Sequence, residues 1–306
     1  MNTTIPFLGE LLALLSAIAF SISNVCISLT GKSGGDRGVM FSVLVTMVLS
    51  ALLWLGLEGG AVLDGAGFRG FESAAGVTWF ALAGVSAMVF GRSLIYESIR
   101  RLGVARASAV KRLSPFFSVI LAAALLGERL YLPDVLGMAA IGCAFALLIR
   151  ENWVERQVSV GAVPLMSYGF GVGASLAYAS AYVMRKIGLE TLPSPAFGTF
   201  VSAVAGFAVF VVLAVFLPRY RSNFAQMFSN LDRFVVGAAV LVSLGQILMF
   251  AALSYAPVST VVMIASLEIF MSMFLSVVVL RSDRRVGPLV LAAAGLASVG
   301  VILVAF

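Results

Sequence analysis

GVARASAVKRLSPFFSVILAAALLGERLYLPDVLGMAAIGCAFALLI, residues 103–149, contains two apolar runs joined by the short polar turn 127–134. Each run has roughly the 20 residues that a helix needs to cross about 30 Å of hydrocarbon. The first run opens with Arg106, Lys111 and Arg112, which is more positive charge than a lipid-facing helix tolerates. The stretch therefore predicts two membrane helices, the first with polar positions that need protein or water around them.

The composition of the whole chain agrees with a membrane protein. Of its 306 residues, 61% are hydrophobic and only 11% are charged, against roughly 25% charged residues in soluble domains. The charged residues lie mostly between long apolar runs, whereas a membrane barrel has alternating segments of about ten residues. The expected fold class is an all-α, multi-pass membrane protein.

Several functions are disfavoured by what the sequence lacks. The chain has no histidine and two cysteines, Cys26 and Cys143, both inside apolar runs, so neither a metal site, a cofactor nor a disulfide framework is expected. The net charge of +6 is spread over loops, which favours contact with the lipid bilayer over nucleic acid. No phosphate-binding loop of the GxxxxGK type occurs, so ATP is not expected to supply energy.

The apolar runs predict ten transmembrane spans, five in each half of the chain. The first half comprises residues 1–150, a connecting loop covers 151–161, and the second half comprises 162–306. The expected spans are 6–29, 39–57, 77–99, 104–126, 132–149, 162–187, 195–217, 234–256, 258–280 and 286–304.

The two halves are related to each other in sequence. At a constant offset of 154, residues 91–126 align with 245–280 and share eight identities, among them Gly91 with Gly245 and Phe116 with Phe270. A repeat with an odd number of spans enters the membrane in opposite orientations in its two copies. An inverted repeat of this kind is typical of alternating-access carriers, which bind substrate near the membrane midplane.

Three segments carry a family resemblance: LSPFFSVILAAALLGERLYLPDVLGMAAIGCAFALLI (113–149), LAYASAYVMRKIG (176–188) and SLEIFMSMFLSVVVL (266–280). They resemble the drug/metabolite transporter superfamily, and within it the ten-span EamA-type carriers. The resemblance implies a transporter in the bacterial inner (plasma) membrane, a monomer or homodimer that binds a small-molecule substrate. The chain departs from the family pattern at LRSDRRVGP (280–288) and at Ile269, where a proline often follows Glu268.

Polar residues inside the spans are the candidates for substrate binding, because a charge at mid-membrane costs about 2.5–3.5 kcal/mol on insertion scales. Arg92 lies deep in the third span, with Tyr96 one turn on. Lys111 shares a helix face with Ser114 and Pro115, and the proline frees a carbonyl that needs protein or water. The alternative for Lys111 is that its long side chain reaches the lipid headgroups.

Glu268 is the strongest single candidate for substrate binding and is the residue expected to couple proton exchange to transport. Its repeat partner is Ser114, whereas Lys111 corresponds to neutral Ala265. The halves thus place opposite charges near one pseudo-twofold axis, which suits a zwitterion or a carboxylate that exchanges protons during transport. The alternative is a buried ion pair between the fourth and ninth spans.

Aromatic and hydroxylic side chains complete the predicted site. They form one face of the first span and one of the sixth, with a glutamine in the eighth. Because a buried tyrosine hydroxyl needs a partner, these faces are candidates for lining as well as packing. The residues are Ser16, Phe20, Ser23, Asn24, Ser175, Tyr178, Tyr182 and Gln246.

Three functions fit the sequence. A secondary transporter of a small polar or amphipathic metabolite, favouring amino-acid-like or organic-anion substrates, fits best. The second is a proton-coupled exporter of organic cations or drugs that uses Glu268. The third, a membrane-embedded lipid-modifying enzyme, lacks a nucleophile with a nearby base, and no catalytic residue is expected.

The orientation in the membrane stays open. The family resemblance implies that both termini are cytoplasmic. However, the loops after the odd-numbered spans carry ten basic residues against four on the opposite face, Arg69, Arg129, Arg185 and Lys186. The positive-inside rule therefore puts the termini outside.

Overall fold

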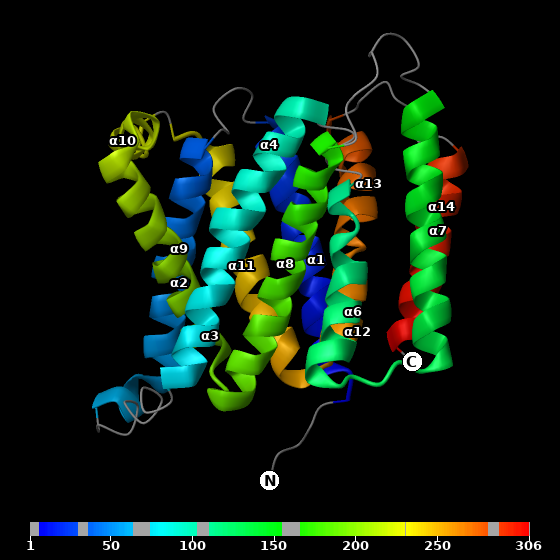
Figure 1. The fold of residues 1–306 in the computed structure, drawn as a ribbon, viewed down its shortest axis with the longest axis horizontal. Coiled ribbons are helices and arrows are strands. Elements are labelled where there is room, and N and C mark those ends of the chain that lie inside the picture. Colours follow the sequence, from blue (N-terminus) through cyan, green and yellow to red (C-terminus); the bar gives the residue numbers. More distant parts are fainter. Residues whose placement is uncertain are drawn as a thin grey trace. The chain divides into compact units, whose positions relative to one another are not determined.

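A computed structural model describes residues 6–29, 36–63, 74–102, 110–154, 166–229, 231–280 and 288–305. Within these ranges every regular element is a helix and none is a strand. The all-α prediction is therefore confirmed for the described part of the chain (Figure 1).

The helices follow the expected spans in order. Several of the long apolar runs are divided between consecutive helices, and a short helix, α10, follows α9. The elements are α1 (Leu8–Leu29), α2 (Asp36–Leu63), α3 (Ala74–Val85), η3 (Ser86–Gly91), α4 (Arg92–Leu102), α6 (Ser114–Leu126), α7 (Leu132–Val154), α8 (Met166–Thr191), α9 (Pro195–Phe216), α10 (Pro218–Ala225), α11 (Arg233–Tyr255), α12 (Val258–Ala265), α13 (Glu268–Leu280) and α14 (Pro288–Ala305).

Within the described ranges, six helical stretches are long and apolar enough to cross a membrane. They are Leu8–Ile27, Gly38–Gly59, Ala74–Ile95, Pro195–Phe216, Arg233–Tyr255 and Val258–Leu275. Ser114–Leu126, Leu132–Leu147 and Ala292–Val304 are apolar but shorter. The expected sixth span corresponds to α8. This helix is not among the six because its glycine, serine and tyrosine residues lower its mean hydropathy. Its 26 residues nevertheless give it a length of about 39 Å, enough to cross a bilayer.

The chain forms two compact units, and each combines segments from both halves of the sequence. Unit 1 consists of Met1–Val85 and Met184–Ala256, and unit 2 consists of Ser86–Val183 and Pro257–Phe306. The chain passes between the units at the start of η3, within α8, and at the junction of α11 with α12.

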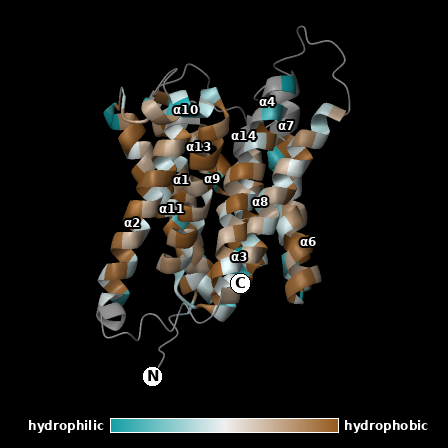
Figure 2. Cartoon of the chain, turned by 60° about the vertical axis from the view of Figure 1, so that its left-hand side comes forward, coloured by the Kyte–Doolittle hydropathy of each residue, from teal (hydrophilic) through white to brown (hydrophobic). Residues whose placement is uncertain are grey.

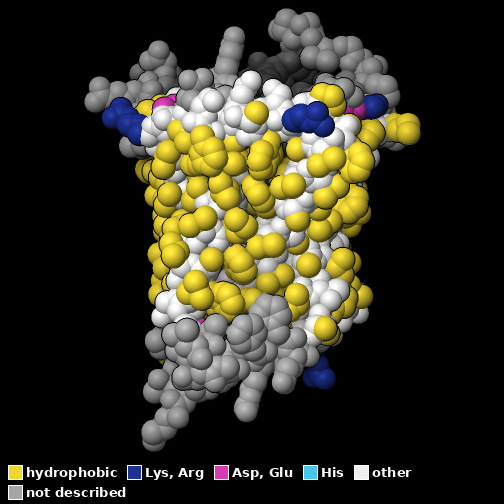
Figure 3. Space-filling model, turned by 90° about the vertical axis from the view of Figure 1, so that its left-hand side faces the viewer, with side chains coloured by type: hydrophobic (Ala, Val, Ile, Leu, Met, Phe, Trp, Pro, Cys, Tyr) yellow, Lys and Arg dark blue, Asp and Glu magenta, His cyan; other side chains and the backbone are white. Residues whose placement is uncertain are grey.

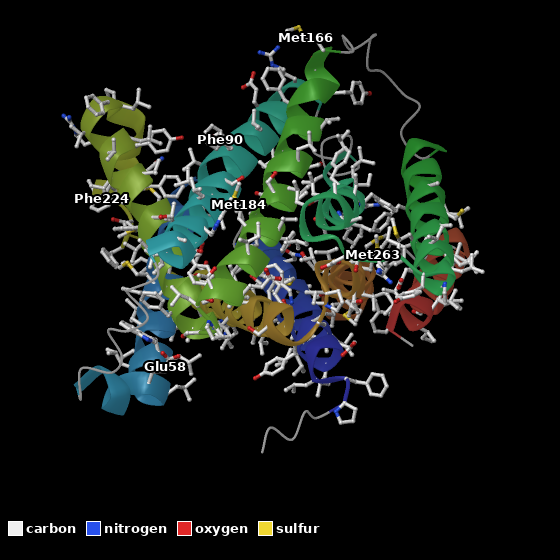
Figure 4. All side chains as sticks on the ribbon, turned by 60° about the horizontal axis from the view of Figure 1, so that its bottom comes forward. Glu58, Phe90, Met166, Met184, Phe224 and Met263 are labelled. Atoms are coloured by element: carbon white, nitrogen blue, oxygen red, sulfur yellow. The ribbon has the colours of Figure 1, made fainter. Side chains whose placement is uncertain are left out.

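In unit 1, α1 packs along α11, and α9 packs against both α2 and α3. The α3–α9 contact is backbone to backbone: a Cβ on Gly84 would lie 2.2 Å from the carbonyl oxygen of Ser202, and the Ser202 hydroxyl donates to the Phe80 carbonyl over 2.7 Å. At the end of α2, Glu58 (labelled in Figure 4) accepts from the Ser194 hydroxyl, which itself caps α9. Small side chains and caps thus hold these helices close together.

In unit 2, α7 packs along α14, and the two helices run side by side in Figures 1 and 4. Gly137 and Gly300 meet at this contact. A Cβ on Gly137 would lie 2.5 Å from the Gly300 carbonyl oxygen, and a Cβ on Gly300 would lie 2.7 Å from that of Gly137. Only glycine allows backbones to approach this closely, so the contact depends on both residues.

The surface has the polarity that a bilayer requires. Large hydrophobic side chains stand exposed on the outer faces of α2 and α9, among them Leu52, Leu57, Val212 and Phe216. Figure 2 shows hydrophobic residues along most of the helix surfaces, and on the face in Figure 3 they form a band with Lys and Arg beyond its two ends. Lipid-facing helices flanked by basic residues account for this pattern.

Candidate functional site

The expected fourth span is broken just before α6. Val110 and Lys111 are helical, Arg112 and Leu113 form a turn, and α6 begins at Ser114. The Leu113 N–H donates to the Val110 carbonyl over 3.0 Å, a bond between residues three apart. The helix therefore tightens into a single 3₁₀-like turn before it continues as α6.

The expected ninth span is broken at the equivalent position. Ser266 and Leu267 form a turn between α12 and α13, and the Leu267 N–H donates to the Ile264 carbonyl over 3.1 Å. This bond matches the bond from Leu113 to Val110 at the offset of 154. Matching interruptions in the two halves of a membrane protein are typical of substrate sites in carriers.

The two breaks have equivalent backbone hydrogen bonds, but only the first is followed by a proline. The Phe117 N–H donates to Leu113 and the Met271 N–H to Leu267, each over 3.0 Å. Pro115 follows the first break, whereas Ile269 occupies its place in the second. Although Ile269 departs from the family pattern, the backbone hydrogen bonds at this point of the ninth span therefore match those of the fourth span.

A π-helical turn lies beside α8 in unit 2. η3 covers Ser86–Gly91, and its Ser86 hydroxyl donates to the Ala177 carbonyl of α8 over 2.9 Å. At the end of η3, a Cβ on Gly91 would lie 3.0 Å from the ring of Tyr178. Single π-turns inside α-helices occur frequently at functional sites, so the surroundings of Tyr178 are a candidate site.

The first break meets the same tyrosine. The Lys111 ammonium lies 5.0 Å from the centroid of the Tyr178 ring, within the range of a cation–π contact. In addition, the Ser175 hydroxyl, one turn earlier in α8, can donate to the Val110 carbonyl at 2.9 Å or to the Gly171 carbonyl of its own helix at 3.0 Å. The Lys111 side chain is therefore directed toward α8, which supports the lining interpretation over contact with lipid headgroups.

The hydroxyl of Ser114 is buried without a hydrogen-bond partner among the described residues. Helical serines commonly donate to the carbonyl four residues back, as Ser118 does to Ser114 over 2.8 Å. For Ser114 that carbonyl belongs to Val110, which already accepts from Leu113 and Ser175. The Ser175 proton can also reach the Gly171 carbonyl, 3.0 Å away. The structure nevertheless shows no bond from Ser114 to Val110, so water or a ligand is left as the partner of this buried hydroxyl.

The neighbouring cation lies over one ring of an aromatic cluster. The Arg112 guanidinium lies 5.8 Å from the centroid of Phe145 in α7. Phe145 also stacks on Phe270 at 5.7 Å and meets Phe116 edge-on at 6.3 Å. Phe116 and Phe270 are repeat partners, so the two halves contribute equivalent rings to one cluster in unit 2.

The other predicted site residues are distributed over both units. Glu268 is the first residue of α13 and is half-buried, as is Tyr182 in α8. Asn24 and Gln246 belong to unit 1, where Asn24 is exposed and Gln246 half-buried. The side chains of Arg92 and Tyr96 lie outside the described part of the structure, although their backbone belongs to α4.

The polar face of the first span has a packing role. The Ser16 and Ser23 hydroxyls donate to the carbonyls of Gly245 and Ala238 in α11, over 2.8 and 3.0 Å. The Phe20 ring covers Gly245, where a Cβ would lie 2.8 Å from it. These three residues hold α1 against α11, which favours the packing role that the sequence left open for this face.

Two charged residues that the sequence did not single out bind helix ends. Glu128, in the turn after α6, accepts from the backbone of Val258 over 2.6 Å and from the backbone and hydroxyl of Ser259 over 3.1 and 2.8 Å. The carboxylate therefore caps the N-terminus of α12. The sequence gives no direct signal for this contact, because 130 residues separate the partners.

Lys186 acts at the end of the preceding helix. Its ammonium donates to the carbonyls of Leu253 and Ala256 over 2.8 and 3.2 Å, at the C-terminus of α11. The adjacent Arg185 is buried and lies 4.8 Å from the Phe250 ring centroid. Both lie inside α8, which runs on to Thr191, so they are not loop residues and do not belong in the comparison of loop charges.

The described residues contain no group of three or more histidine, cysteine, aspartate or glutamate side chains able to hold a metal ion.

Comparison with known proteins identifies the family. The sequence model of the EamA-like transporter family matches the chain twice, at residues 7–150 and 165–306. The chain belongs to the EamA-like transporter family. The two matches give this EamA-like protein the two-repeat architecture and make it an integral membrane protein of a family whose members transport small molecules.

A solved structure supports the fold of the EamA-like chain. It is a crystal structure of a protein with 14% sequence identity, and it matches with a TM-score of 0.70 over 96% of this chain and 95% of its own. At 14% identity this structural similarity establishes only that the two proteins share a fold. No curated protein sequence matches the chain.

Proposed function

We propose that this EamA-like protein is a secondary transporter of a small polar or amphipathic metabolite, with amino-acid-like and organic-anion substrates favoured. The ten spans expected from the sequence act as two inverted five-helix repeats, 1–150 and 162–306, and transport proceeds by alternating access. The protein works in a bacterial inner membrane as a monomer or homodimer.

One observation carries the proposal: the fourth and ninth spans break at equivalent residues, and a polar residue begins the helix after each break. Ser114 begins α6 and Glu268 begins α13. Interrupted helices expose backbone groups at mid-membrane, which is useful only where a polar ligand or water meets them. Lys111 and Tyr178 lie at the first break, so charge and aromatic surface are available together.

The substrate preference follows from the charges around the first break. Lys111 and Arg112 both precede α6, while Glu268 is the acidic group at the second break. A substrate with a carboxylate and an apolar part matches this balance. If the substrate also carries an amine, its carboxylate matches the basic residues at the first break and its amine matches Glu268 at the second.

Transport assays in proteoliposomes test the proposal. The purified protein is reconstituted and loaded with a panel of amino acids, organic anions, phosphorylated metabolites and lipophilic cations, and exchange against labelled substrate is measured. We expect exchange of an amino acid or organic anion, strongly reduced in Arg92→Ala and Lys111→Ala. Glu190→Gln, at an exposed position near the end of α8, is the control and is expected to transport normally.

A proton-coupled exporter of organic cations is the second candidate, supported by the position of Glu268 at the start of α13 and the aromatic cluster around Phe145. It predicts uptake of lipophilic cations driven by a pH gradient. Glu268→Gln would abolish that uptake, whereas Lys111→Ala would leave it intact. Unchanged transport in Glu268→Gln contradicts this candidate and the coupling role of Glu268.

A further inference from the structure

We propose that the start of α6 binds the carboxylate of the transported molecule, through the Ser114 hydroxyl and the Lys111 ammonium, with the Tyr178 ring beside it. The inference rests on the proposed transport function and adds the chemistry of one end of the substrate. It is carried by a buried hydroxyl that has no hydrogen-bond partner among the described residues.

The position of the hydroxyl favours an anion. Ser114 is the first residue of a helix of 13 residues, so it lies where the partial positive charge of the helix is concentrated. Side chains on a helix tilt toward its N-terminus, which directs the hydroxyl toward the turn at Arg112 and Leu113. The oxygen has no partner among the described side chains and backbone groups, and only 6% of the residue is exposed.

The geometry of the turn brings Lys111 to the same side. Residues three apart in a 3₁₀-like turn are eclipsed, and Lys111 and Ser114 are separated by this interval. The neighbouring cation is directed elsewhere, because Arg112 lies over Phe145 in α7 while Lys111 lies over Tyr178 in α8.

An ammonium, a hydroxyl donor and a helix N-terminus all favour an anion. A phosphate ester carries nearly two charges and is typically bound by forked guanidinium groups. The start of α6 therefore suits a carboxylate better. The Tyr178 ring, packed against Gly91, provides apolar surface next to the charged group.

Thermal stabilisation of the full-length protein in detergent tests the subsite directly. The probes are L-leucine, isovalerate and benzoate, compared with leucinamide, isoamylamine and inorganic phosphate. We expect the carboxylates to stabilise the wild type more than the amide, the amine or phosphate. Ser114→Ala is expected to weaken carboxylate binding by about tenfold or more, because a hydrogen bond to a charged group is lost.

Ser118→Ala is the matched control. Ser118 lies one turn along α6 and is also buried, but its hydroxyl already donates to the Ser114 carbonyl. It is expected to bind the carboxylates as the wild type does. Lys111→Gln should remove the preference for leucine over leucinamide, and Lys111→Arg should restore most of it.

Three outcomes overturn the subsite: equal affinity of Ser114→Ala and the wild type, equal stabilisation by leucine and leucinamide, or no stabilisation of the wild type by any of the carboxylates. The first means that water alone satisfies the Ser114 hydroxyl. None of these outcomes removes the transport function, which the proteoliposome exchange assay decides separately. If that assay shows exchange of a cation or neutral solute instead, the carboxylate subsite and the preference for amino-acid-like and organic-anion substrates are both wrong, while the transport function stands.

Discussion

The serine side chains of the spans differ in what their hydroxyls contact. Ser16, Ser23 and Ser175 each donate to a carbonyl of a packed neighbour, whereas Ser114 does not. Sequence reasoning placed all four on polar faces but could not separate them, because the separation depends on which carbonyl in another segment is still free. Only the three-dimensional contacts reveal that the Val110 carbonyl is occupied.

Glu128 is expected to stabilise the fold through its charge and its acceptor geometry. Both carboxylate oxygens accept hydrogen bonds at the start of α12, so Glu128→Gln replaces one acceptor by a donor. The expected loss is about 1–3 kcal/mol, visible as a lower melting temperature of the detergent-purified protein. Glu190→Gln is the control, and equal melting temperatures for the two variants would contradict the capping role.

Gly91 is expected to fix the position of the Tyr178 ring. A Cβ at Gly91 would already lie 3.0 Å from the ring, so Gly91→Val should displace it from Lys111. We expect weaker stabilisation by any substrate of the wild type, with folding retained. Gly169→Val, a change at an α8 position with open space around it, should bind normally; unaltered binding by Gly91→Val would show that the ring position does not matter.

At the scale of helices, the hydropathy of the sequence located the apolar runs well but missed their interruptions. The expected span 258–280 contains both α12 and α13, and no residue in SLEIF marks the break. A proline, Pro115, marks the first break in the sequence, but the equivalent position at the second break is Ile269. The interruption therefore depends on packing around the helix, which hydropathy does not record.

The glycine pair between α7 and α14 gives a prediction for a helix–helix contact. Gly300→Ala would force a Cβ to within 2.7 Å of the Gly137 carbonyl oxygen and push the helices apart. We expect a loss of about 1–3 kcal/mol, measured as a lower melting temperature. Gly295→Ala lies in the same helix with nothing within 4 Å; it should melt as the wild type does, and similar effects of both changes would refute the close contact.

At the scale of the whole molecule, the sequence repeat and the compact units divide the chain differently. The family matches cover residues 7–150 and 165–306, whereas each compact unit takes segments from both halves. The internal repeat could be recognised from identities at a fixed offset. The exchange of segments could not, because it depends on contacts such as α1 with α11 that are remote in the sequence.

Cysteine accessibility in cells tests the expected topology. With Cys26 and Cys143 replaced by alanine, single cysteines are introduced at Tyr131, Pro193 and Asn223. If the chain crosses the membrane ten times, the first two positions face one side and the third faces the other. A membrane-impermeant maleimide should therefore label either Asn223→Cys alone or the other two together, and this pattern also reveals the orientation; labelling of all three would contradict the topology.

The contact between α7 and α14 has a consequence for how the protein is made. The ribosome adds residues from the N-terminus, so α7 enters the membrane long before its partner, Gly300, exists. During that interval α14 is not there to pack on Gly137, and unit 2 cannot close until α14 has been translated. Unit 1 is completed earlier, because α1 needs only α11, which ends at Tyr255. The two units are thus expected to mature one after the other, with unit 2 dependent on an intact α14.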